Sequence, residues 1–255
     1  MFDIKTKTSD FASIVVTHDC NKNCIFCVDK YRGRKEYIDL NTVHSSLYLL
    51  RNNTNVKEIL LVGGEPTLHP DIVKIAKLVK SFDFKLILTT NYSKPEIIKL
   101  LDGIVDCFNI SYYGKKDLPK QKDFKSDITL NTIIHKQQLE TKEKLDNFIN
   151  KYQTDLNLKF STLAITNSWT KEYQKVSYLD CLNSENVVLF NEILGQLYRG
   201  TVIKRQDKVL NQKAEQSIKC HVNGEISYSW EREERYSYEK RDIYLTELKG
   251  VYQNG

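Results

Sequence analysis

The sequence predicts an α/β fold, a partial (β/α)6 TIM-like barrel with a C-terminal α+β cap. Short β-branched runs alternate with amphipathic stretches from about residue 12 to residue 165, the pattern of βα units and a parallel sheet. Six such units occur, fewer than the eight of a closed barrel. We therefore expect an open barrel whose ligands bind at the C-terminal strand ends, where βα loops gather.

Composition is consistent with one main core. The 255 residues are 40% hydrophobic, enough to bury a substantial interior. The formal charge of +5 is small, and basic and acidic residues are interspersed, so charge alone does not indicate a nucleic-acid-binding protein. No apolar run of about 18 residues occurs, and the N-terminus lacks the apolar stretch of a secretory signal. We expect a cytoplasmic protein without membrane contacts.

The expected elements follow one another regularly. Strands are expected at residues 12–17, 58–62, 85–90, 104–110, 128–134 and about 156–165. Helices are expected around residues 40–50, 72–82 and 137–152, and a short one after Ser93, which we predict to be its N-cap. Residues 1–166 would form the barrel core.

Residues 167–255 would form a C-terminal extension. The alternation of strands and helices stops there, and a helix is expected at about 184–197. Asn223-Gly224 is a hairpin turn signal between two strand-like runs, residues 217–222 and 225–230. We expect this region to cap the barrel.

One loop carries three of the six cysteines. Cys20, Cys24 and Cys27 follow the first expected strand with C-x3-C-x2-C spacing. Thiolates are preferred ligands of iron–sulfur clusters and of zinc, whereas disulfide frameworks are unusual in cytosolic proteins. Three ligands would leave one iron of a [4Fe–4S] cluster open to a substrate or cofactor. The loop therefore predicts a metal site.

A zinc site is the competing interpretation. His18 or His44 could complete three cysteines to a closed, four-coordinate site. The loop GGEPTLHP after the second expected strand favours the cluster instead, because a structural zinc ion does not need a glycine-rich, acidic loop nearby.

The two loops together resemble those of the radical S-adenosylmethionine (radical SAM) superfamily. That family has C-x3-C-x2-C after the first barrel strand and a GGEP-type loop after the second, here Gly63-Gly64-Glu65-Pro66. The resemblance covers about residues 12–165. It implies that the open iron binds the amino and carboxylate groups of S-adenosylmethionine, and that the reduced cluster cleaves this cofactor to methionine and a 5′-deoxyadenosyl radical.

The GGEP loop would bind the cofactor's amino group. Gly63 and Gly64 lack side chains, which would let the backbone approach a ligand closely. Glu65 or its neighbouring carbonyls could accept hydrogen bonds from the amino group, with Pro66 completing the loop.

Other cofactor contacts are implied by position. Phe26 stands where the family commonly places an aromatic ring against adenine. Asn91 and Ser111 end the third and fourth expected strands, and Asn131 falls in the fifth, at positions similar to the family's polar cofactor contacts. Tyr92 replaces the glycine of the family's frequent Thr-Asn-Gly, so that backbone geometry needs testing.

The C-terminal extension would determine the substrate. Only Cys181 and Cys220 occur there, fewer than the auxiliary-cluster cysteines of the larger peptide-modifying relatives. Cys220 precedes the expected hairpin turn and could donate a hydrogen atom to a substrate radical, or be a small buried hydrophobe. Cys107 is expected in the core.

Three functions stay open. The first is radical chemistry on a peptide or other small molecule, such as epimerisation, cross-linking or dehydrogenation. The second is radical modification of RNA or a nucleotide precursor, which the charge of +5 supports weakly. The third is a non-enzymatic zinc- or cluster-binding module. Radical chemistry implies oxygen sensitivity and an electron donor of the flavodoxin or ferredoxin type, because the cluster must be reduced before each cleavage.

Overall fold

The computed structural model describes residues 8–24, 27, 33–114, 118–134, 142–152, 154–162 and 216–227. Its elements are β1 (Thr8–Thr17), α1 (Leu40–Asn53), β2 (Glu58–Gly63), η2 (Pro66–Leu68), α2 (Ile72–Ser81), β3 (Lys85–Thr90), α3 (Pro95–Leu101), β4 (Cys107–Ser111), η3 (Gln121–Asp123), β5 (Asp127–Ile134), α4 (Lys142–Tyr152), β6 (Asn157–Thr162), β7 (Gln216–Cys220) and β8 (Ile226–Ser227). Phe26, Cys181 and the helix expected at 184–197 lie outside the described residues. In the part described, no helix has the length and apolarity needed to cross a membrane.

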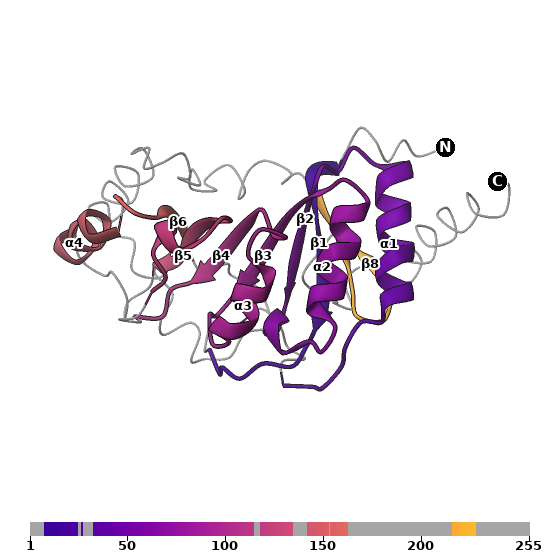
Figure 1. Ribbon diagram of the computed structural model, residues 1–255, viewed down its shortest axis with the longest axis horizontal. Helices are drawn as coiled ribbons and strands as arrows, with labels where there is room; N and C mark the ends of the chain where they lie inside the picture. The colour runs from indigo at the N-terminus through magenta and orange to yellow at the C-terminus, as the bar shows by residue number, and fades with distance from the viewer. Residues whose placement is uncertain are drawn as a thin grey trace, which may run out of the picture.

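The strands form one eight-stranded sheet in the order β6-β5-β4-β3-β2-β1-β7-β8. β1 to β6 pair in parallel with their neighbours, so their C-terminal ends meet at one edge of the sheet. Helices α1, α2 and α3 lie side by side over one face (Figure 1). The predicted α/β class and its parallel βα series are confirmed.

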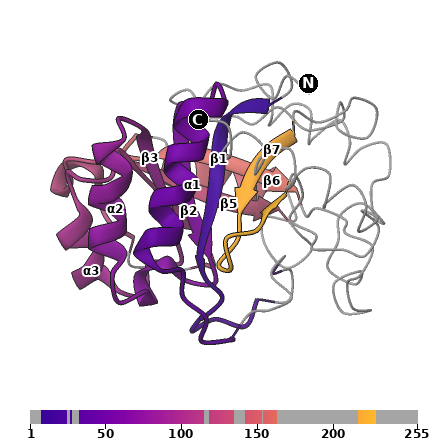
Figure 2. The ribbon, with the colours of Figure 1, turned by 90° about the vertical axis from the view of Figure 1, so that its right-hand side faces the viewer.

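The hairpin expected in the C-terminal extension belongs to this same sheet. β7 pairs in parallel with β1, and β8 returns antiparallel to β7. Figure 2 shows the hairpin alongside β1, and in the strand order it lies at the opposite end of the sheet from β6. The hairpin thus extends the barrel sheet itself.

Contacts with the helices distinguish the two faces of the sheet. The Cys220 thiol of β7 hydrogen-bonds Ser46 of α1, so this side chain points toward the helices. In the register, Cys220 lies beside Ile14, and this fully buried row continues through Leu61, Leu88, Phe108 and Ile128. Neighbouring residues along each strand point to the opposite face. We call that opposite face the inner face; it includes Ser13, Cys107, Asn109, Thr129 and Lys219.

Helix α1 forms where the apolar period predicts it. Val43, Leu47 and Leu50 recur at helical spacing and are all buried against the sheet. Asp39 is the N-cap, and its carboxylate accepts from the main-chain N–H groups of Asn41 and Thr42, each at 2.9 Å. Capping fixes the residue at which the chain arriving from the cysteine loop becomes helical.

Besides β1, which begins at Thr8 rather than at residue 12, two predicted boundaries were wrong. Ser93 is not the N-cap of α3, because Lys94 occupies that position while the Ser93 hydroxyl accepts from the Asn21 side-chain amide at 2.8 Å. The strand expected from residue 104 begins at Cys107. Its first residues instead close a turn after α3, in which Ile104 and Val105 donate to the Leu101 carbonyl, both at 3.0 Å.

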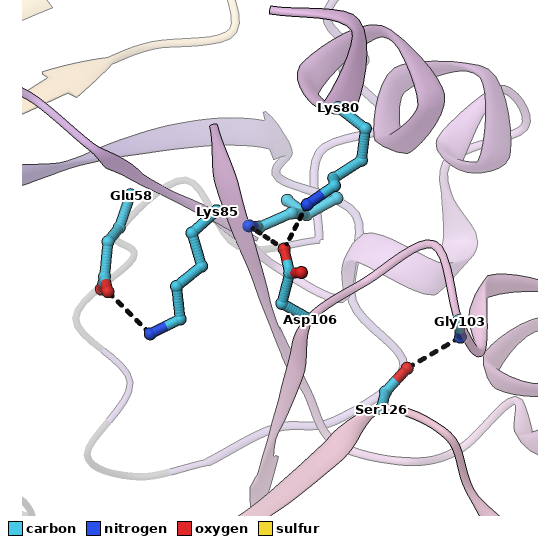
Figure 3. Close-up of polar contacts among 7 residues, drawn as sticks. Glu58, Lys80, Lys85, Gly103, Asp106 and Ser126 are labelled. Atoms are coloured by element: carbon cyan, nitrogen blue, oxygen red, sulfur yellow. Dashed lines mark hydrogen bonds and ion pairs between the residues drawn. The ribbon is translucent and has the colours of Figure 1, made fainter. Parts of the chain in front are cut away.

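Polar contacts hold the N-terminal edge of the sheet together (Figure 3). Asp106 Oδ2 accepts from Lys80 Nζ of α2 at 2.7 Å and from the main-chain N–H of Leu86 in β3 at 2.6 Å. Lys85 of β3 pairs with Glu58 of β2 at 2.7 Å. These bonds fix the strands relative to one another at the edge away from the βα loops.

Replacing Asp106 with alanine removes the acceptor of the Leu86 N–H and the partner of Lys80. We expect the free energy of unfolding to fall by about 1–2 kcal/mol, with the half-exposed ion pair contributing under about 1 kcal/mol of that. Urea unfolding followed by circular dichroism measures the change. Lys80→Met is the matched control, and an equal loss in both variants would assign the whole effect to the ion pair.

Candidate functional site

The cysteine loop is closed at its base by main-chain hydrogen bonds. It leaves β1 after Thr17 and returns beside it, because Gly33 donates to the His18 carbonyl at 2.7 Å and His18 donates to Glu36 at 3.2 Å. Ile38 then donates to Val16 at 2.9 Å. Both limbs of the loop are therefore tied to the end of β1.

The three cysteines lie half-buried on this loop. Cys27 donates its main-chain N–H to the Cys24 carbonyl at 3.2 Å, and Cys20 Sγ accepts from the Lys22 N–H at 3.4 Å. Burial raises the pKa of Tyr113, and the nearby Cys24 and Cys27 raise it further, so both cysteines lie near this phenol. Among the described residues, no three metal-ligating side chains are gathered tightly enough to hold an ion. Convergence of the three thiols stays a prediction.

The GGEP loop packs directly against the cysteine loop. Gly64 donates to the Thr17 carbonyl and Glu65 donates to the Asp19 carbonyl, each at 2.7 Å. A Cβ at Gly63 would collide with the Thr17 carbonyl oxygen, and one at Gly64 with that of Asp19. The two glycines therefore allow the two loops to touch, a role that the sequence argument had given to a ligand.

The Glu65 carboxylate is fully buried within the protein. Its Oε1 accepts from the Thr67 N–H at 3.1 Å and from the hydroxyls of Thr67 and Thr90 at 2.6 and 2.7 Å. Its Oε2 accepts from the Asn91 N–H at 2.6 Å. Four donors commit this side chain to joining the loop to the end of β3. Contact of this loop with a cofactor stays a prediction, and Pro66 continues the loop into η2.

Asn91 connects the end of β3 to the cysteine loop. Its Nδ2 donates to Asn21 Oδ1 at 2.9 Å, and Asn21 directly follows the first cysteine. Tyr92 has a φ of 55°, the left-handed conformation that glycine adopts easily. Tyr92 therefore adopts this conformation at a cost of about 1–2 kcal/mol for a residue with a Cβ.

His69 is a site residue that the sequence argument missed. Its Nδ1 accepts from the Asp71 N–H at 3.0 Å, so Nε2 carries the proton and donates to the Ile38 carbonyl at 2.9 Å. Burial lowers the pKa of His69, favouring this neutral form. His69 therefore holds the returning limb of the cysteine loop. The sequence feature that could have identified His69 is its position within GGEPTLHP, the loop after β2.

Ser111 and Asn131 are brought together on the inner face. They are paired in the register of β4 and β5, and Tyr112 donates to the Asn131 carbonyl at 2.8 Å. The Asn131 Oδ1 is buried and has no hydrogen-bond partner within the described residues. A buried acceptor of this kind costs free energy until a donor reaches it, so the position fits a polar ligand.

Three other predictions are corrected. Cys220 is fully buried between the sheet and α1, and burial raises its pKa to about 12, so the predicted hydrogen-atom donor faces away from the inner face. Cys107, expected in the core, lies on the inner face with Sγ 3.4 Å from Thr129 Oγ1. His44 is exposed on α1, edge-on to Phe82, which gives it no place in a zinc site at the cysteine loop.

These features define a class of protein. Its members have a parallel βα sheet in which the loop after the first strand carries three cysteines and packs against a Gly-Gly-Glu loop after the second strand. Residues 14–114 match the model of the Radical SAM superfamily.

Two relatives show how far the sequence similarity extends. The chain is 30% identical over 156 residues to a candidate glycyl-radical enzyme activating enzyme of Methanocaldococcus jannaschii, covering 60% of this chain and 56% of that protein. It is 37% identical over 111 residues to the GTP 3′,8-cyclase of Chlorobaculum tepidum, covering 41% and 33%. The chain thus spans only about a third to just over half of these relatives' lengths.

A solved structure supports the fold. SuiB of Streptococcus suis, bound to its precursor peptide SuiA, matches with a TM-score of 0.63 at 16% identity, covering 98% of this chain and 67% of that chain. At this identity the similarity concerns the arrangement of helices and strands alone.

Gly64→Ala should disrupt the contact between the two loops. The added Cβ collides with main-chain atoms of Asp19, which cannot move without breaking the base of the cysteine loop. We expect a loss of about 3 kcal/mol or more in the free energy of unfolding, at the upper end for overpacked sites. Gly114→Ala is the control, because no atom lies within 4 Å of its added Cβ; its positive φ of 72° adds backbone strain of about 1–2 kcal/mol, so it should still lose less stability than Gly64→Ala. A tolerated Gly64→Ala would contradict the close packing.

Glu65→Gln should weaken the hydrogen bonds that join the GGEP loop to the end of β3. One carboxylate oxygen becomes an NH2 group facing main-chain donors, which costs about 1–3 kcal/mol. We expect less iron bound per chain after anaerobic reconstitution, together with lower stability in urea. Glu96→Gln on the exposed side of α3 is the matched control and should change neither. Unchanged iron content and stability in Glu65→Gln would exclude the proposed positioning role.

Proposed function

We propose that this chain is a radical SAM enzyme that holds a [4Fe–4S] cluster through Cys20, Cys24 and Cys27 and binds S-adenosylmethionine at the C-terminal edge of the sheet. The interlock between the cysteine loop and the GGEP loop is the observation that carries the proposal. The Gly64 N–H bonds to Thr17, where the cysteine loop begins, and the Glu65 N–H bonds to Asp19 within that loop. The superfamily match over residues 14–114 supports it.

The cluster and S-adenosylmethionine, when bound, would supply a 5′-deoxyadenosyl radical that abstracts a hydrogen atom from the substrate. The chain's own residues would position these groups. Gly63 and Gly64 bring the loops into contact, while Glu65 and Asn91 hold the end of β3 against them. The buried Asn131 Oδ1 is an acceptor for a ligand donor. Phe26 keeps its proposed place against the adenine.

We propose a peptide as the substrate, supported by the fold similarity to SuiB, which is solved with its precursor peptide. A nucleotide is a second candidate, favoured by the sequence similarity to GTP 3′,8-cyclases. Because Cys220 lies in the core, epimerisation would need another hydrogen donor, whereas cross-linking and dehydrogenation need none. A flavodoxin- or ferredoxin-type protein in the cytoplasm would supply electrons.

Anaerobic purification tests the cluster directly. We expect a brown protein with about four irons per chain that cleaves S-adenosylmethionine to 5′-deoxyadenosine with dithionite, as a three-cysteine cubane requires. The triple variant with Cys20, Cys24 and Cys27 changed to alanine should lose the iron, the colour and the cleavage. Cys107→Ala is the control and should keep all three, because it lies on β4 away from the loop. A colourless, zinc-loaded wild type would overturn the proposal.

A further inference from the structure

A lysine lies on the inner face beside two polar residues, Ser111 at the end of β4 and Asn131 within β5. In the register of the sheet, Ser111 of β4 pairs with Asn131 of β5, and Asn131 pairs with Lys159 of β6. Lys159 lies one residue after Leu158, which is fully buried on the helix-covered face, so its side chain belongs to the inner face. The three residues form one row across three strands, near the edge where parallel βα sheets bind their ligands.

Lys159 has no counter-charge within the described residues. It is half-buried, and burial lowers its pKa, which Cys107 partly offsets. None of the ion pairs formed by described residues includes it. Of the carboxylates on the inner face, Glu58 is held by Lys85 at 2.7 Å, and Asp127 is exposed at the N-terminal end of β5. A cation removed from water without a partner is costly, so the site favours an anion.

The position on β6 separates this lysine from the cluster loop. β6 is the far strand of the series, five strand spacings from β1, or roughly 24 Å along the sheet. Along the sheet, Lys159 is therefore the member of the row farthest from the cysteine loop, whereas Ser111 lies near that loop through Tyr113, which contacts both Ser111 and Cys24.

We propose that Lys159, with Asn131 and Ser111 beside it, forms a subsite on the inner face for a carboxylate or phosphate group of the substrate. The cation pairs with the anion, and Asn131 Oδ1 accepts from a donor on the same ligand. Assigning the anion to the substrate rests on the proposed radical function. The subsite itself requires no cluster.

The test observes Lys159 directly. The full-length protein is reductively dimethylated with 13C, the Lys159 resonance is assigned by its absence in Lys159→Arg, and inorganic phosphate and acetate are titrated separately. We expect a saturable shift of this resonance with either anion. Lys85, already paired with Glu58, should not shift and serves as the internal control. The absence of a saturable shift at Lys159 would overturn the proposal.

Phosphate binding by variants, and in the presence of S-adenosylmethionine, tests the proposal further. By calorimetry, Lys159→Met should bind phosphate at least tenfold more weakly, whereas Lys159→Arg and Lys85→Met should bind as wild type does. Equally weakened phosphate binding in Lys85→Met would show that binding depends only on the net charge of the protein, and it would overturn the proposed subsite. Saturating S-adenosylmethionine should leave phosphate binding intact, and displacement would reassign the anion to the cofactor's carboxylate. Phosphate binding at Lys159 without reductive cleavage would refute the radical function while keeping the subsite.

Discussion

The buried carboxylate of Glu65 is the constraint on which the site depends. A charged group without exposure is costly unless donors surround it, and here four hydrogen bonds from Thr67, Thr90 and Asn91 do so. Those donors come from η2 and from the end of β3, so both segments must be in place together. The cysteine loop joins them through the Gly64 and Glu65 N–H groups. Three strand ends are thereby fixed around one side chain.

Much of the barrel could be predicted because its signals are local. β3 begins and ends where the β-branched run does, at Lys85 and Thr90, and β2 extends the expected range by a single residue. The cysteine and GGEP motifs also identify the correct neighbours, since loops after adjacent parallel strands must emerge at the same edge. What the motif did not reveal is that the two glycines serve a contact between the loops.

The direction of individual side chains could not be predicted in the same way. A strand shows one face to the helices and the other to the inner face, and shifting the register by one residue exchanges them. Cys220 was expected to face a substrate, but pairing of β7 with β1 places it beside Ile14, on the face that α1 covers. Cys107 was expected in the core and instead precedes the core residue Phe108. Ser93 was expected as a cap, but its hydroxyl contacts Asn21, distant in sequence.

The two faces of the sheet have different roles, one in stability and the other in the proposed binding of ligands. Among the described residues, the helix-covered face is mostly apolar, and its burial stabilises the fold. Along β4 to β6 the inner face instead places Asn109, Thr129 and Lys159 where a purely structural sheet would have apolar residues. In the proposed arrangement, β1 to β3 hold the cluster and its cofactor through rigid main-chain contacts, whereas β4 to β6 present the side chains that select a target. Amino-acid substitutions on β6 can then change which substrate binds without disturbing the hydrogen bonds around Glu65.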